Sequence, residues 1–190
     1  MDSNGASRKK RGRDDTADLY CPTVITLERV LDTNFEELAR RLPAFGVVWR
    51  NNNKLQTLQV RQALTHALLQ VHWGITLASV PSQYLCPPVP NRYFYVRWML
   101  DEVLPRSRDS FIPSSDDNDD DDDSPPKMVG LDIGTGAFCI YPLLLCGSTA
   151  NEIEMYATDI DEHSVQWAQS HVTANNLQDR IHVLCVSSTD

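Results

Sequence analysis

The chain has 190 residues, 42% of them hydrophobic, and a formal net charge of −9 at pH 7. This hydrophobic content suits a globular protein with one modest core. No stretch approaches the roughly 18–20 consecutive apolar residues of a membrane span, and no secretory leader precedes the first predicted helix. We therefore expect a soluble intracellular protein without membrane association.

The charge is concentrated in two polar segments. Seven acids lie within residues 114–124, so the rest of the chain carries a charge of only −2. Such a dense run repels itself and supports no core, which predicts a disordered insertion over residues 109–126. Mimicry of nucleic acid is the less favoured interpretation of this run. Residues 8–13 hold five basic side chains in six positions, within a predicted disordered tail over residues 1–31.

The basic cluster has two functional interpretations. It is typical of a nuclear-import signal or of an arm that binds RNA phosphates. We expect a nuclear protein and consider an additional cytoplasmic pool. A tail without either role is nearly as well supported by the residues alone.

The cysteines and histidines show no metal-binding pattern. No cysteine pair has the C-x-x-C spacing of a zinc site, and at least three cysteines lie in apolar segments, which predicts reduced core thiols. The five histidines form no ligand set either, so we expect no metal. His163 and His171 are expected to face solvent from their helix. The cysteines are Cys21, Cys86, Cys139, Cys146 and Cys185.

Residues 32–108 are predicted to form a small, mostly helical region that binds RNA. Asp32 is placed as the capping residue of its first helix. A second helix spans residues 57–73, and Gly74 ends it as a C-cap. The apolar stripe of this second helix consists of Leu64, Ala67, Leu68 and Val71.

A proline-rich segment leads into a further helix. Prolines at positions 87, 88 and 90 favour an extended backbone, and Arg92 follows them. An arginine on such a rigid lead-in suits a clamp for a ligand carboxylate. A structural role for Arg92 in capping this segment is an equally weighted alternative. The helix that follows bears Tyr93, Val96, Trp98 and Leu100.

Residues 127–190 are predicted to begin with a strand, a glycine turn and a helix, followed by a second strand. The first strand carries Asp132 and runs into a turn with Gly134 and Gly136. Glycine at those positions lets backbone approach a ligand closely. The second strand ends at Asp159, the position where dinucleotide-type folds hold ribose hydroxyls.

A helix over residues 164–174 and a third strand over residues 181–186 complete half of a doubly wound α/β sheet. Three parallel strands alone would leave a long edge and one flank uncovered. We therefore expect the chain to be a fragment of a longer protein.

The residues around the turn favour S-adenosylmethionine over a dinucleotide. Cys139 occupies the position of the third glycine in a G-x-G-x-x-G turn, and no basic residue lies nearby to bind a pyrophosphate. The carboxylate of Asp132 would repel phosphate but suits a ligand with a positive centre and an amino-acid part. A glycine turn with a purely structural role is the less favoured alternative.

Several long motifs together resemble the methyltransferase-like 16 family of RNA adenine-N6 methyltransferases. They occur in order over residues 33–187, interrupted only by the acidic insertion, and comprise residues 34–43, the helix ending at 73–74, residues 85–98 and residues 130–144. The resemblance implies a Rossmann-like class I S-adenosylmethionine-dependent methyltransferase fold, incomplete here with its first three strands. It also implies a structured RNA substrate: U6 spliceosomal RNA for eukaryotic members and 23S ribosomal RNA for bacterial ones.

The resemblance also assigns roles to residues. Arg92 would contact the carboxylate of the methyl donor and Asp159 its ribose hydroxyls, although animal members have Glu at the latter position. Gly134 would pass the methionine portion, with Asp132 and Gly136 shaping the turn. A further contact falls near Ser188 or Thr189. The implied cofactor-binding residues are thus Arg92, Asp132, Gly134, Gly136, Asp159 and Thr189.

No catalytic residue is expected in this chain. The family's Asn-Pro-Pro-Phe motif follows a fourth strand and does not occur in the 190 residues, and Asn175-Asn176 lacks the prolines. Such a motif accepts the hydrogens of the adenine amino group, and the target base must first leave its stack. We accordingly expect a donor pocket without an acceptor site. Two alternatives stay open: a catalytically inactive module that binds RNA or a partner, and a methyltransferase for a non-RNA substrate.

Overall fold

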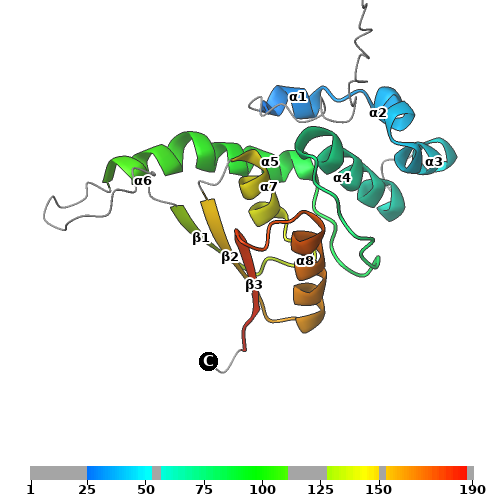
Figure 1. The fold of residues 1–190 in the computed structure, drawn as a ribbon. Helices are drawn as coiled ribbons and strands as arrows, with labels where there is room; N and C mark the ends of the chain where they lie inside the picture. Colours follow the sequence, from blue (N-terminus) through cyan, green and yellow to red (C-terminus); the bar gives the residue numbers. More distant parts are fainter. Residues whose placement is uncertain (1–24, 53–56, 111–127, 150–152, 188–190) are drawn as a thin grey trace, which may run out of the picture.

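A computed structural model describes residues 25–52, 57–110, 128–149 and 153–187 (Figure 1). Helices precede a three-stranded sheet that alternates with two further helices, as predicted. The predicted basic cluster and acidic run, like Thr189, lie outside the described residues. The elements are α1 (Leu27–Leu31), α2 (Phe35–Arg41), α3 (Pro43–Asn52), α4 (Leu58–Trp73), α5 (Val89–Trp98), a π-helical turn (Met99–Val103), α6 (Leu104–Ser110), β1 (Met128–Ile133), α7 (Ile140–Ser148), β2 (Ile153–Asp159), α8 (Glu162–Ala174) and β3 (Ile181–Cys185).

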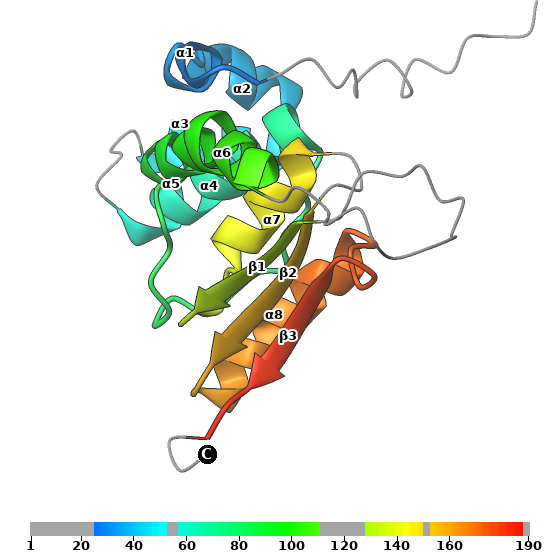
Figure 2. The ribbon, with the colours of Figure 1, turned by 90° about the vertical axis from the view of Figure 1, so that its left-hand side faces the viewer.

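The sheet has the order β1-β2-β3, and both pairs are parallel. Parallel neighbours need a crossover, and α7 and α8 supply one each. Both helices lie on the same face of the sheet (Figures 1 and 2). Their buried residues meet those of the strands in one core that extends into the helical region. The incomplete Rossmann-like arrangement that the sequence predicts is therefore confirmed.

The opposite face of the sheet is apolar and exposed. Val129, Leu131 and Ile133 of β1 are each at least 62% exposed, and Tyr156 and Leu184 continue the same face on β2 and β3. Within the described residues β1 pairs only with β2, so its outer edge is open as well. The sequence predicted an uncovered flank and an edge at β3, but the edge at β1 was not foreseen.

Helix α8 corrects one prediction. Its apolar residues Val165, Ala168 and Val172 are buried against the sheet as expected, and His163 is exposed. His171, however, is 0% exposed, although solvent exposure was predicted. The side of α8 that carries His171 is covered by a segment from the helical region, and such a contact between distant segments leaves no periodic signal in the sequence.

The start of the helical region also differs from the prediction. Asn34, not Asp32, caps α2, because its side-chain oxygen accepts hydrogen bonds from the N–H groups of Glu36 and Glu37. Asp32 instead follows the end of α1, a short helix that lies inside the predicted tail. Helix α4 ends as predicted at Gly74, whose φ of 67° is left-handed.

Helix α5 begins earlier than expected. Pro88 is its N-cap and Pro90 lies in its first turn, where a missing N–H costs nothing. Arg92 is therefore part of the helix and does not precede it. The helix continues through the π-helical turn into α6, which ends at Ser110, two residues beyond the predicted domain boundary.

Residues 75–88, here called the strap, join α4 to α5 and run between α4 and α8. The Asn175 side chain on α8 accepts from the Thr76 N–H at 2.8 Å and donates to the Thr76 carbonyl at 2.7 Å. From α4, the Gln62 amide donates to the carbonyl of Val80, and the Thr65 hydroxyl donates to that of Pro87. The strap is thus fixed from both sides.

Candidate functional site

The turn after β1 is held against the end of β2. The N–H groups of Gly134 and Thr135 both donate to the carbonyl of Thr158, at 2.8 and 2.9 Å. Gly134 and Gly136 have φ values of 77° and 65°, a region that other residues enter at a cost of roughly 1–2 kcal/mol. A Cβ at either glycine would meet no protein atom within 4 Å, so backbone conformation rather than crowding within the protein requires glycine here.

Asp159 completes the turn from the tip of β2. One carboxylate oxygen accepts from the Gly136 N–H at 2.8 Å, and the other accepts from the Asp161 N–H at 3.0 Å. Each carboxylate oxygen can accept a second hydrogen bond. Asp159 therefore fixes the turn and keeps acceptor capacity for a ligand.

Arg92 approaches the same turn from α5. Its guanidinium lies 5.8 Å from the ring centroid of Tyr141 on α7, within the range of a cation–π contact. No ion pair connects Arg92 to any carboxylate of the described part of the chain. Arg92, Gly134 and Gly136 line one cavity of about 330 Å³.

The strap forms the other wall of this cavity. Its lining includes Tyr84, Leu85 and Pro87 from the strap, together with Tyr141 and Ser164. None of these five residues was predicted from the sequence to lie in the site. Tyr141 carried a usable signal, because it is the second residue of the helix that follows the glycine turn. The strap residues reach the cavity only through tertiary folding.

Asp132 lies beside this cavity and not in it. Asp132 lines a neighbouring cavity of about 410 Å³ at the edge of β1. Burial raises the pKa of the Asp132 carboxyl, the Thr135 hydroxyl opposes that rise, and the negative charge of Asp159 adds to it. The Asp132 Oδ2 atom is buried without a hydrogen-bond partner. Such a buried oxygen is costly unless a ligand or water satisfies it.

Cys139 has a structural role in the turn. It occupies a left-handed conformation with φ of 49° as the N-cap of α7 and is fully buried. Burial raises the pKa of its thiol to about 12, so it is not a nucleophile at neutral pH. Cys86 and Cys146 are likewise free and buried, which confirms the predicted core thiols, whereas Cys185 is exposed.

The predicted site residues therefore separate into three groups. Arg92, Gly134 and Gly136 share a cavity, and Asp159 is hydrogen-bonded to one of its glycines. Asp132 is adjacent and lines the next cavity. Thr189 lies outside the described residues. Within the described ranges, no group of three or more His, Cys, Asp or Glu could hold a metal, and none of the helices is long and apolar enough to cross a membrane.

Comparison with known proteins identifies the family. A family model described as RNA methyltransferase matches residues 35–189. The chain belongs to this family. The RNA N(6)-adenosine-methyltransferase METTL16 of Gallus gallus is 38% identical over 125 residues, which is 66% of the chain and 19% of that protein. The ribosomal RNA large subunit methyltransferase F of Flavobacterium psychrophilum is 33% identical over 124 residues, or 63% of the chain and 35% of that protein.

Solved structures of the family share the fold. The N-terminal domain of human METTL16 in complex with SAH is 31% identical with a TM-score of 0.65, covering 84% of the chain and 57% of the solved one. The catalytic domain of human METTL16 in complex with MAT2A 3'UTR hairpin 1 has a TM-score of 0.63 at 31% identity, covering 82% and 48%. The expected family, fold class and methyl-donor class are confirmed at the level of the family. The chain spans about a fifth to a third of these curated relatives and about half of the solved chains.

Proposed function

We propose that the chain supplies the methyl-donor site of an S-adenosylmethionine-dependent RNA (adenine-N6) methyltransferase. The proposal rests on one observation: Arg92, Gly134 and Gly136 line the same cavity, and Asp159 accepts a hydrogen bond from the Gly136 N–H. These residues come from α5, the turn and β2, so their meeting is a tertiary arrangement and not a local motif.

The residues present fit the donor. Arg92 has a guanidinium without an acidic partner among the described residues and would bind the donor's carboxylate. Open space above Gly134 and Gly136 would admit the methionine portion. Asp159 would accept from the ribose hydroxyls, and the buried orphaned oxygen of Asp132 would contribute negative charge near the donor's positive centre.

The donor, when bound, supplies a methyl group on a sulfonium for in-line transfer to a nucleophile. The role of this chain would then be to orient the methyl group, because the transfer depends on alignment more than on acid–base groups. We propose structured RNA as the substrate, with U6-like small nuclear RNA as the first candidate. The groups that accept the hydrogens of the adenine amino group are expected from the Asn-Pro-Pro-Phe motif, which does not occur in these 190 residues.

Two measurements test this proposal. SAH should bind to the wild-type protein in titration calorimetry, and Arg92→Ala should weaken binding while Arg106→Ala does not. Arg106 is a suitable control because it forms a solvent-exposed pair with Glu102 on the surface of α6. Transfer of a labelled methyl group to an unpaired adenine of an RNA hairpin should require this chain together with the Asn-Pro-Pro-Phe motif. Equal SAH affinity for both variants, or transfer to protein in place of RNA, would overturn the proposal.

A nuclear location is also part of the proposal. It rests on the basic cluster at residues 8–13. A fluorescent fusion in which these basic residues are replaced by Ala should lose nuclear enrichment relative to the unchanged fusion. Retained enrichment would leave the cluster as an RNA-binding arm.

A further inference from the structure

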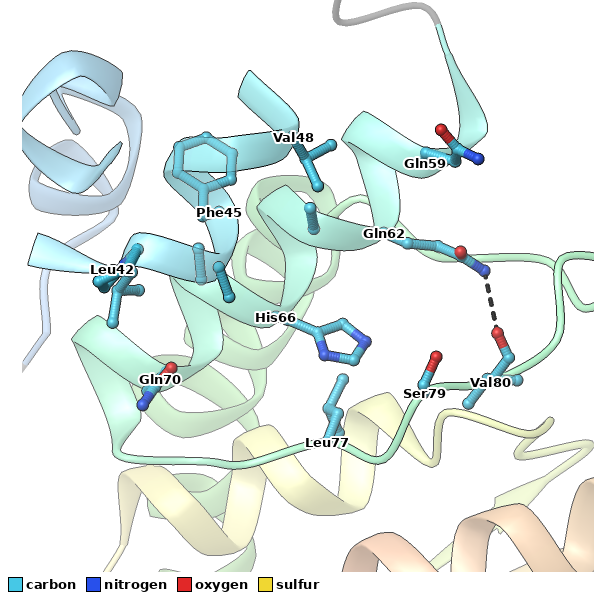
Figure 3. Close-up of a pocket in the computed structure, with 14 residues that line it drawn as sticks. Leu42, Phe45, Val48, Gln59, Gln62, His66, Gln70, Leu77, Ser79 and Val80 are labelled. Carbon is cyan, nitrogen blue, oxygen red and sulfur yellow. Dashed lines mark hydrogen bonds between the residues drawn. The ribbon is translucent and has the colours of Figure 1, made fainter. Parts of the chain in front are cut away.

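A second, larger cavity lies away from the donor site, between α3, α4 and the strap (Figure 3). This α3–α4 groove has a volume of about 750 Å³, within the range of ligand sites. Gln59, Gln62, His66 and Gln70 project into it from one face of α4, and Phe45 lines it from α3. In Figure 3, His66 lies between Gln62 and Gln70 and faces Leu77 and Ser79 of the strap.

The lining of the groove is mostly apolar, and its polar groups are uncharged. Amide groups, an imidazole and the Ser79 hydroxyl offer both donors and acceptors, and no Asp, Glu, Lys or Arg lines the groove. Burial lowers the pKa of His66, so its ring is neutral near pH 7 and provides one donor and one acceptor. A phosphate would find no cation here. A neutral group with a hydrogen-bonding edge, such as a nucleobase, matches this lining.

The chain around the groove is basic. Between Glu37 and Asp101 the sequence contains no Asp or Glu and seven Arg or Lys, in a protein whose net charge is −9. Arg41 directly precedes the groove residue Leu42, and Arg50 lies in the last turn of α3; both are exposed. Cations beside an uncharged pocket fit a ligand that has a neutral base and anionic phosphates on either side of it.

We propose that the α3–α4 groove binds an unpaired nucleobase of the RNA substrate, while basic residues between Glu37 and Asp101 contact the flanking phosphates. Sequence-dependent RNA recognition uses such splayed bases, which are held by their edges in pockets. This inference rests on the proposed function and adds a substrate subsite to it. The strap connects this groove to the donor cavity, because Leu77 and Val80 line the groove and Leu85 and Pro87 line the donor cavity.

The test measures RNA affinity by fluorescence anisotropy on the intact protein. The probes are a labelled RNA hairpin with an unpaired loop and a blunt RNA duplex with the same stem. The main variant is Gln59→Ala/Gln70→Ala, whose side chains are exposed and whose loss leaves the fold intact. His66→Phe is the second variant. Gln166→Ala, an exposed glutamine on α8, is the matched control.

The double glutamine variant should lose affinity for the hairpin by about 5-fold or more, as expected for two or more lost hydrogen bonds. Its affinity for the duplex and for SAH should equal that of the wild type, as should both affinities of Gln166→Ala. Unchanged hairpin affinity, or equal loss for hairpin and duplex, would overturn the groove as a base site. Failure of the proposed function would look different, because the wild-type protein would then bind no SAH.

Discussion

Asp159 is the residue at which the structure makes the sharpest prediction about the donor site. The Asp159→Ala substitution removes the acceptor of two backbone N–H groups, those of Gly136 and Asp161. It also removes the carboxylate that we propose accepts from the donor's ribose. Loss of hydrogen bonds to a charged group costs about 1–3 kcal/mol, which corresponds to a loss of about 5- to 150-fold in SAH affinity.

The assay is titration calorimetry with SAH, with unfolding by urea measured in parallel. Asp159→Glu should retain most of the affinity, since it keeps a carboxylate at the strand tip. Asp161→Ala is the control from the next turn. The Asp161 carboxylate accepts from the N–H and hydroxyl of Ser164 and caps α8, without contacting the glycine turn. Its loss should reduce stability and leave SAH affinity within about twofold.

Two results would refute this reasoning. Unchanged affinity in Asp159→Ala would make Asp159 a surface acid that only ties the turn. Equal losses in Asp159→Ala and Asp161→Ala would show that any loosening near α8 impairs binding, so that Asp159 would have no direct contact with the donor.

Three further predictions concern stability. Asn175→Ala should lower the free energy of unfolding, measured in urea, by about 1–2 kcal/mol, because Thr76 is exposed and water replaces part of the lost hydrogen bonds. Asn176→Gly is the control. It should not lower the free energy of unfolding, because Asn176 has a φ of 55°, which glycine adopts readily. Burial lowers the pKa of His171 to about 4, so the contribution of this residue to stability should fall by about 2 kcal/mol between pH 6.5 and pH 5. His72, whose pKa is also lowered to about 4, should contribute over the same range. His171→Phe should therefore reduce the slope of a melting-temperature profile between pH 6.5 and pH 4, and an unchanged slope would contradict the assignment. Gly46→Ala places a Cβ 2.3 Å from the Ala39 carbonyl oxygen and should lower the melting temperature, whereas an unchanged value would mean that α2 and α3 can separate at little cost.

The elements predicted best are those whose signals are contiguous. Strand β1, the glycine turn and α7 follow one another within about twenty residues, and their apolar pattern and left-handed glycines predict them without tertiary information. Gly74 is another local signal, because a C-cap glycine needs only the preceding helix. The family motifs around Arg92 and Gly134 are also contiguous, which explains why the sequence places both in the site.

The predictions that failed depend on contacts between distant segments. His171 is buried because the strap, more than 80 residues earlier in the chain, covers that side of α8. Asp32 was chosen as a cap because the short helix α1 has only one buried residue, Val30, and leaves little periodic pattern.

The strap explains how a helical region and a half-sheet can form one site. It lines the α3–α4 groove with its first residues and the donor cavity with its last, and Asn175 fixes it to α8 near its start. Asn175-Asn176 was excluded as a catalytic pair, and the hydrogen bonds of Asn175 give it a positioning role. A substitution that loosens the strap should therefore change affinity for RNA and for SAH together, whereas a substitution within the groove should change affinity for RNA alone. Measuring both affinities for Asn175→Ala and for the double glutamine variant separates the two cases, and an Asn175→Ala protein that binds both ligands like the wild type would show that the two cavities are independent.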